Sequence, residues 1–292
     1  MKIRGLIATL VPVLLIAGVL WLDQTIPPPK RIDEVRWRVM PHLRAELSAM
    51  GFAPGDPIFI RIFKESQELE LWMKPKNKPR YELWMRWPIP GLSGHLGPKL
   101  AEGDYQNPEG FYDVSADALN PLSVCHLSFN TGFPNAYDQS LGRTGSWIMV
   151  HGGHCSVGCF AMTDPVIEEI YLLAEAALKN GQPTFPVHVF PFRMTKERMA
   201  EAKAEGNEWL PFWENLRMGY EPFEANHVPP RVTTAEGRYL FLGGPSTQTT
   251  SARRKAACST SAFSNSGVPS GFHSPMRRVA PECRVTAVVT LP

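Results

Sequence analysis

Short apolar runs separated by turn-forming residues constrain the fold of this chain more than any other feature of its sequence. Three of them lie close together, at Ile58–Phe63, Glu68–Met73 and residues 81–87, and each alternates or stays apolar over a length typical of a strand. Further strand-like runs follow at residues 111–114, 125–129, 146–150 and 186–190. The first three are predicted to form a meander, and the chain is predicted to be mainly β.

Helices are predicted to flank these strands. One helical face of residues 31–50 is apolar at Val35, Val39, Leu43 and Leu47. A second helix is expected over residues 164–181, because Asp164 and Pro165 are typical of an N-cap followed by a first-turn proline. Two more helical segments are expected to start at Thr195 and Glu208. The predicted fold class is therefore α+β, with one domain over residues 57–242.

The N-terminus predicts a membrane anchor. Lys2 and Arg4 precede an uncharged, mostly apolar run over residues 5–22, which reaches the lower length limit for crossing a bilayer, about 17 residues. Because no small-x-small cleavage site follows, residues 1–25 are predicted to be an uncleaved signal-anchor, with a cleaved signal and a short core helix as alternatives. The positive-inside rule then places the rest of the chain outside the membrane, after a linker and helix over residues 26–56.

The C-terminal residues 243–292 differ from the rest in composition. They are crowded with Ser, Thr, Gly and Pro and show no sustained periodicity, so they are predicted to be a disordered tail. The formal net charge of the chain is only +2, without a Lys/Arg-rich block. Nucleic acid is therefore not expected as a partner.

The run His151-Gly-Gly-His-Cys-Ser-Val-Gly-Cys159 carries the strongest chemical signal. An imidazole within reach of a thiol takes its proton and makes it a nucleophile, so Cys159 is predicted to be the nucleophile and His151 its base. Gly158 allows a tight turn and exposes backbone N–H groups beside the sulfur for an oxyanion. Ser156 is expected to orient the imidazole or the loop.

Two other interpretations of this run stay open. Cys159 and His151 are either a structural thiol and a core histidine, or they join His154 and Cys155 as four ligands of a zinc ion. The spacing argues against zinc, because four ligands within nine residues have to wrap one ion on a single loop. No metal and no cofactor is predicted.

At these residues the chain resembles the L,D-transpeptidase family of the YkuD type. His151-Gly152 and Ser156-Val-Gly-Cys159 correspond to the family's His-Gly and Ser-x-Gly-Cys elements, and the short gap between them is similar to the YafK-like branch. Similar runs extend over residues 57–241, at Lys99 and at residues 106–112, 120–121, 126–130, 133–138 and 142–145.

The resemblance implies a β-sandwich catalytic domain in the periplasm that acts on peptidoglycan stem peptides through a thioester on Cys159. The implied reaction is transpeptidation. Hydrolysis that releases a wall-bound lipoprotein by the same chemistry is an alternative, and an inactive or zinc-binding wall-binding module is an alternative of another class. The implied partners are stem peptides, a wall-attached lipoprotein and, through the N-terminal segment, the inner membrane.

Other positions are predicted with less support from the motif. The commoner family pattern has histidine where this chain has Val157, so His151 alone is carried over as the base. Cys155 is expected either to form a reversible disulfide with Cys159 or to be a small buried residue. The substrate-binding residues are predicted to be Arg143, Gly152, Tyr112 and Tyr137, with a structural role as the alternative for Arg143 and packing for the tyrosines.

Overall fold

A five-stranded sheet with the order β3-β2-β1-β9-β4 organises residues 31–242, the part of the chain that the computed structural model describes. The meander is confirmed, because β1 (Ile58–Phe63) pairs antiparallel with β2 (Glu68–Met73) and β2 with β3 (Glu82–Pro88). On the other side of β1, β9 (Phe185–Phe190) pairs in parallel, and β4 (Gly110–Val114) closes the sheet antiparallel to β9.

The central strand β1 is buried on both faces, since the side chains of a strand alternate between them. Ile58, Ile60 and Ile62 belong to one hydrophobic core, whereas Phe63 belongs to a second. The first core takes its helical side chains from α2 (Arg31–Ala49) and α4 (Asp164–Lys179). The second takes most of them from α5 (Lys196–Ala204) and α6 (Leu210–Asn226).

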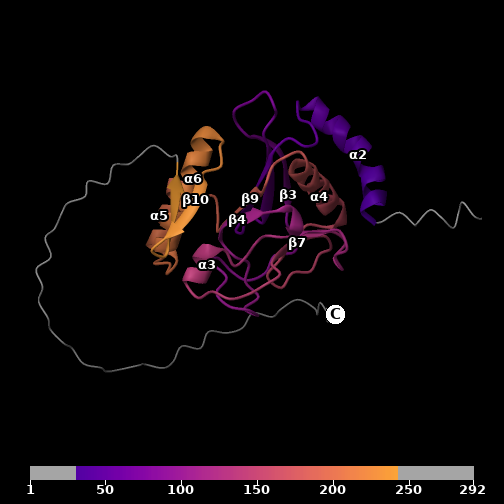
Figure 1. The fold of residues 1–292 in the computed structure, drawn as a ribbon. Helices are drawn as coiled ribbons and strands as arrows, with labels where there is room; N and C mark the ends of the chain where they lie inside the picture. Colours follow the sequence, from indigo (N-terminus) through magenta and orange to yellow (C-terminus); the bar gives the residue numbers. More distant parts are fainter. Residues whose placement is uncertain (1–30, 243–292) are drawn as a thin grey trace, which may run out of the picture. The chain divides into compact units, whose positions relative to one another are not determined.

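Figure 1 shows the resulting layers, with α2 and α4 on one side of the sheet and α5 and α6 on the other. The predicted face of α2 is confirmed at Val35, Leu43 and Leu47, which are buried, while Val39 is partly buried against the same core. Ion pairs from Arg36 to Glu175 and from Arg38 to Glu168 tie α2 to α4.

The start of α4 differs from the prediction by one residue. Thr163 is the N-cap, with φ at 70°, and Asp164 is the first helical residue. The Asp164 carboxylate accepts the Gly153 N–H at 2.8 Å instead of capping its own helix. The helix therefore begins against the loop that carries the His/Cys motif.

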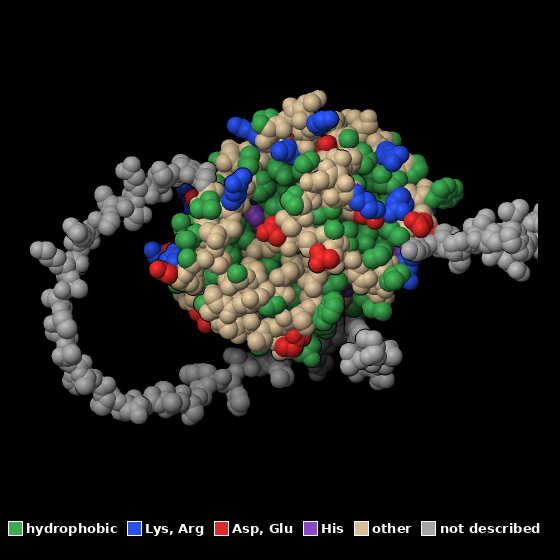
Figure 2. Space-filling view, in the orientation of Figure 1, with side chains coloured by type: hydrophobic (Ala, Val, Ile, Leu, Met, Phe, Trp, Pro, Cys, Tyr) green, Lys and Arg blue, Asp and Glu red, His purple; other side chains and the backbone are tan. Residues whose placement is uncertain are grey.

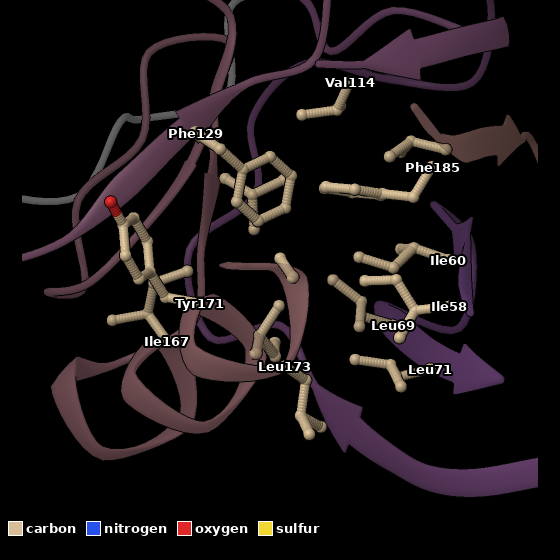
Figure 3. Close-up of a cluster of buried hydrophobic side chains, with 14 of the residues drawn as sticks. Ile58, Ile60, Leu69, Leu71, Val114, Phe129, Ile167, Tyr171, Leu173 and Phe185 are labelled. Carbon is tan, nitrogen blue, oxygen red and sulfur yellow. The ribbon is translucent and has the colours of Figure 1, made fainter. Parts of the chain in front are cut away.

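A four-stranded sheet with the order β5-β6-β7-β8 carries the motif, and its strands are shorter than the sequence predicted. They are β5 (Leu119–Asn120), β6 (Ser128–Asn130), β7 (Met149–His151) and β8 (Phe160–Ala161). Both sheets contribute to the first core, where the Phe129 and Phe185 rings meet edge to face (Figure 3), with their centroids 5.4 Å apart. Cys125 begins the run predicted as a strand at residues 125–129, but it lies half-buried in the turn before β6.

Two short elements complete this part of the chain. The helix α3 (Ala136–Ser140) follows β6, and a hairpin of β10 (Arg231–Ala235) and β11 (Arg238–Leu242) follows α6. The hairpin was not predicted. On the face drawn in Figure 2, basic and acidic side chains are interspersed.

The predicted anchor at residues 1–25 and the predicted tail at residues 243–292 lie outside the described residues. Within residues 31–242, none of the helices has the length and apolar character needed to cross a bilayer. All described residues belong to one compact unit.

Candidate active site

Two backbone groups at the start of β7 hold the Cys159 sulfur. The Met149 N–H donates to Sγ at 3.4 Å, and the thiol donates to the Trp147 carbonyl at 3.5 Å. Cys159 carries a free thiol, is half-buried, and lies directly before β8, which pairs in parallel with β7. The sulfur is therefore fixed beside the strand that ends in His151.

His151 lies two residues beyond Met149, so both side chains point to the same face of β7, with Cα atoms about 6.5 Å apart. The imidazole is buried, and its Nδ1 lies 2.5 Å from the Gly152 carbonyl oxygen. Because a carbonyl only accepts, Nδ1 carries the proton, and Nε2 of the neutral ring is left with a lone pair. None of the hydrogen bonds within residues 31–242 joins the imidazole to the thiol.

The electrostatics keep both groups neutral in the resting site. Burial raises the pKa of the Cys159 thiol, opposed by the hydrogen bond from the Met149 N–H. Burial lowers the pKa of His151, opposed by its hydrogen bond to the Gly152 carbonyl. A neutral imidazole within hydrogen-bond reach of a thiol is able to take up its proton when the sulfur attacks.

The loop before Cys159 is fixed by two serines. Ser156 donates to the Cys159 carbonyl at 2.6 Å, so it orients the loop and not the imidazole. Gly158 has φ at +117°, a conformation that favours glycine. Its N–H donates to the Ser93 hydroxyl at 2.7 Å, so of the N–H groups predicted beside the sulfur this one already has an acceptor. Within the described residues no acceptor is bonded to the N–H of Cys159 itself.

The sequence did not single out Ser93 or Asn107. The Asn107 amide is fully buried beneath the loop, and its Nδ2 donates to the carbonyls of Gly158 at 2.9 Å and Cys159 at 2.6 Å. Its Oδ1 accepts the Ser93 N–H at 2.8 Å. Residues 106–112 had been noted only as part of a family-like run, because contacts across 51 positions leave no local pattern.

Gly152 is packed too closely for a side chain. A Cβ atom there would lie 2.5 Å from Asp164 Oδ1 and 2.8 Å from the Cys125 carbonyl oxygen. Its N–H donates to the carbonyls of Cys125 and Leu127 at 3.1 Å. Gly152 therefore sets the path of the chain directly after His151, and this placement gives no support to a substrate-binding role.

Three of the predicted substrate-binding side chains are buried elsewhere. Arg143 donates to Asp138 at 2.8 Å and its guanidinium lies over the Tyr137 ring. The Tyr112 hydroxyl donates to the same Asp138 carboxylate at 3.2 Å, and Tyr137 stacks on Tyr239 with ring centroids 4.2 Å apart. These contacts engage the groups that were predicted to meet a substrate, so the structural alternatives are favoured.

The four residues considered as zinc ligands do not converge. His154 and Cys155 are exposed, whereas His151 is buried. Within residues 31–242, no group of three or more His, Cys, Asp or Glu side chains is arranged to hold a metal ion. Cys155 is thus not the small buried residue that was expected, and Cys159 is not in a disulfide.

Comparison with known proteins identifies the family. The sequence matches none of the family models, but it is 42% identical over 186 residues to the Escherichia coli K12 protein named "Putative L,D-transpeptidase YafK". The match covers 64% of this chain and 74% of that protein, and the same values hold for the protein of Escherichia coli O157:H7. The chain therefore belongs to the L,D-transpeptidase family, and within it to the YafK-like branch.

Solved structures show only a loose likeness. The helical cell shape determining protein Pgp2 of Campylobacter jejuni is 17% identical, with a TM-score of 0.37 over 66% of this chain and 80% of that one. Bd1075 of Bdellovibrio bacteriovorus is 21% identical, with a TM-score of 0.33 over 58% and 60%. At these TM-scores the likeness supports no statement about the site.

Proposed function

We propose that this protein is a peptidoglycan-modifying cysteine acyltransferase, an L,D-transpeptidase that works through a thioester on Cys159. The observation that supports the proposal best is the free Cys159 thiol, which accepts the Met149 N–H at the start of β7. Met149 lies two residues before His151, whose imidazole Nε2 is left to accept a proton. Membership of the L,D-transpeptidase family supports the substrate class.

In the first half-reaction the Cys159 thiol gives its proton to His151 Nε2 while Sγ attacks the carbonyl of the diaminopimelate residue in a donor stem peptide. The carbonyl oxygen becomes an oxyanion, for which the Cys159 N–H is the proposed donor. The C–N bond then breaks, the leaving amine takes the proton from His151, and a thioester remains.

In the second half-reaction an amine of an acceptor attacks the thioester carbonyl. His151 takes a proton from that amine, the C–S bond breaks, and the proton returns to the sulfur, so that an amide is formed and the thiol is restored. Water in place of the amine gives hydrolysis. A product assay on isolated cell walls separates the two reactions, because release of a bound peptide or protein without new cross-links excludes transpeptidation.

Mass spectrometry after incubation with a carbapenem tests the thioester chemistry. The wild-type protein is expected to gain one carbapenem mass at Cys159, and Cys159→Ala none. Cys125→Ala is a matched control, because Cys125 is the other free, half-buried cysteine of the described residues and burial also raises the pKa of its thiol. An adduct that persists in Cys159→Ala, or no adduct in the wild type, contradicts the mechanism.

We also propose that the catalytic domain works in the periplasm, tethered to the inner membrane by residues 1–25. The support is the charge pattern of Lys2 and Arg4 before the apolar run. Fractionation of cells followed by protease treatment of spheroplasts tests the proposal. A domain that stays protected from protease in intact spheroplasts contradicts it.

A further inference from the structure

The amide of Asn107 holds the peptide unit that ends in Cys159. Its Nδ2 group uses both N–H bonds, one on the Gly158 carbonyl and one on the Cys159 carbonyl, and its Oδ1 accepts the Ser93 N–H. This side chain is fully buried. Only the orientation with the NH₂ group toward the two carbonyls satisfies all three contacts, because a carbonyl oxygen cannot donate.

The bond to the Gly158 carbonyl also fixes the direction of another group. The C=O of Gly158 and the N–H of Cys159 belong to one planar trans peptide unit, so they point in opposite directions. Because Asn107 draws this carbonyl toward itself, it directs the Cys159 N–H away from the buried side of the loop. The Ser93 hydroxyl holds the preceding peptide unit through the Gly158 N–H.

Asn107 is itself held in place by a buried ion pair. The Lys64 ammonium donates to the Asn107 carbonyl and to Glu109 Oε1, both at 3.0 Å, and to the Gly97 carbonyl at 2.6 Å. Glu109 accepts the Gly97 N–H at 2.7 Å and the Trp213 indole N–H at 2.8 Å. Asn107 is therefore fixed at two points, by the hydrogen bonds of its side-chain amide and by the bond from Lys64 to its backbone carbonyl.

We propose that Asn107 is a positioning residue that aims the Cys159 N–H at the developing oxyanion. The inference rests on the proposed function, since it assumes acylation of Cys159. It also assigns a role to the run at residues 106–112, which the chemistry of the His/Cys motif did not use. A misdirected N–H leaves the sulfur in place and removes a donor that matters only in the transition state.

Two reactions of the same thiol separate this role from a general loosening of the site. Carbapenem acylation passes through a tetrahedral oxyanion, whereas alkylation by iodoacetamide forms no oxyanion and reports only the reactivity of the thiol. Asn107→Ala and Asn107→Asp both remove the two N–H donors, and Asn107→Asp keeps an oxygen for the Ser93 N–H. Acylation is expected to slow by about 100-fold in both variants, the typical effect of losing one oxyanion donor. Alkylation is expected to stay within about threefold of the wild type.

Asn215 provides a matched control. It is a second buried asparagine that clamps backbone, because its amide donates to the Tyr239 carbonyl and accepts the Tyr239 N–H, both at 2.9 Å. Asn215→Ala is expected to lower the melting temperature and to leave acylation within about twofold, because it shares no contact with Cys159.

The outcomes are distinguishable. Acylation of folded Asn107 variants at the wild-type rate, or equal slowing of acylation and alkylation, overturns the positioning role. Absence of acylation in the wild type, by contrast, overturns the proposed function. If both Asn107 variants fail to fold, Ser93→Ala serves instead. It removes the nearer of the two hydroxyl acceptors of the Gly158 N–H and leaves the Ser156 hydroxyl at 3.3 Å. It is expected to slow acylation by about 10-fold without slowing alkylation, and equal rates again overturn the proposal.

Discussion

Two polar clusters, each with a fully buried carboxylate, begin at the same strand and differ in what their side chains bind. The first cluster, which we term the frame, consists of Lys64, Ser93, Asn107 and Glu109. The second, the ionic cluster, consists of Arg61, Glu70, Arg86 and Arg193. Arg61 lies in β1 and Lys64 follows directly after its end.

The frame binds mostly backbone. Lys64 and Asn107 donate to four main-chain carbonyls between them, and Glu109 accepts a main-chain N–H. The ionic cluster binds side chains only, with Glu70 accepting from Arg61, Arg86 and Arg193 as well as from the Trp72 indole. Contacts to backbone set the course of a loop, whereas contacts between side chains hold one face of the sheet together. The frame is therefore expected to control acylation, and the ionic cluster stability.

The largest expected effect is on stability, from Glu70→Ala. Glu70 is fully buried, so its loss leaves three guanidinium groups without their shared carboxylate, which is expected to lower the free energy of unfolding by about 3–5 kcal/mol. The carbapenem acylation rate of the folded fraction is expected to be unchanged. Denaturant unfolding and acylation kinetics on the same preparation measure both. If acylation of Glu70→Ala is tenfold slower than in the wild type, the ionic cluster also controls acylation, and the division of roles between the two clusters is wrong.

The ionic cluster also predicts a dependence of stability on pH. Burial alone raises the pKa of Glu70, but the charges of Arg61 and Arg193 and the hydrogen bonds from Trp72 and Arg86 together lower it from 4.5 to about 2. Because the folded-state pKa is depressed, the stabilisation is present above pH 4.5 and is lost as the pH falls toward 2. The shift is worth about 3 kcal/mol. Between pH 2 and pH 6, the free energy of unfolding is expected to change less with pH in Glu70→Gln than in the wild type. Equal pH dependence in the two proteins contradicts the depressed pKa of Glu70.

A smaller effect on stability is expected from Gly152→Ala, in the loop between His151 and Cys159. The new Cβ meets Asp164 Oδ1 and the Cys125 carbonyl, so the free energy of unfolding is expected to fall by about 1–3 kcal/mol. Acylation is expected to slow as well, because the Gly152 carbonyl holds the His151 ring.

Gly142→Ala is the control for Gly152→Ala. Gly142 has φ at +69° but open space around its Cα, so the substitution brings only the backbone cost of about 1 kcal/mol. Its acylation rate is expected to match the wild type. If Gly142→Ala and Gly152→Ala slow acylation equally, close packing at Gly152 is not what positions His151.

Periodic segments were predictable from the sequence because their signals are local. The strands β1, β2 and β9 and the helix α2 each repeat an apolar pattern over at least one face. The strands of the second sheet have only two or three residues, too few for a period. The missed hairpin did carry a signal, because Glu236 and Gly237 form a two-residue turn with φ at 52° and 68°, the conformation of a type I′ turn.

The candidate site was predictable in its reacting groups and not in its support. Cys159 and His151 lie eight positions apart, so one motif contains both. The frame joins Lys64, Ser93 and Asn107 to Cys159 across long sequence separations, and such contacts depend on how the two sheets pack. For Arg143 the sequence left substrate binding and a structural role open, and the structural role is favoured because the residue pairs locally with Asp138 in a buried position.

The smallest expected effect on stability comes from Trp147, two residues before β7. Its side chain is 73% exposed, and its carbonyl accepts the Cys159 thiol. Trp147→Ala is expected to change the free energy of unfolding by no more than about 0.5 kcal/mol. The KM for a wall peptide is expected to rise by about threefold to tenfold, since an aromatic contact contributes about 0.5–1.5 kcal/mol.

Trp37→Ala is the matched control, because Trp37 is 84% exposed on α2 and its substitution is expected to leave KM unchanged. Equal KM values for both variants would show that the Trp147 side chain does not bind the substrate. A rise for Trp147→Ala alone would identify a third region of the molecule, besides the frame and the ionic cluster, that binds substrate without stabilising the fold.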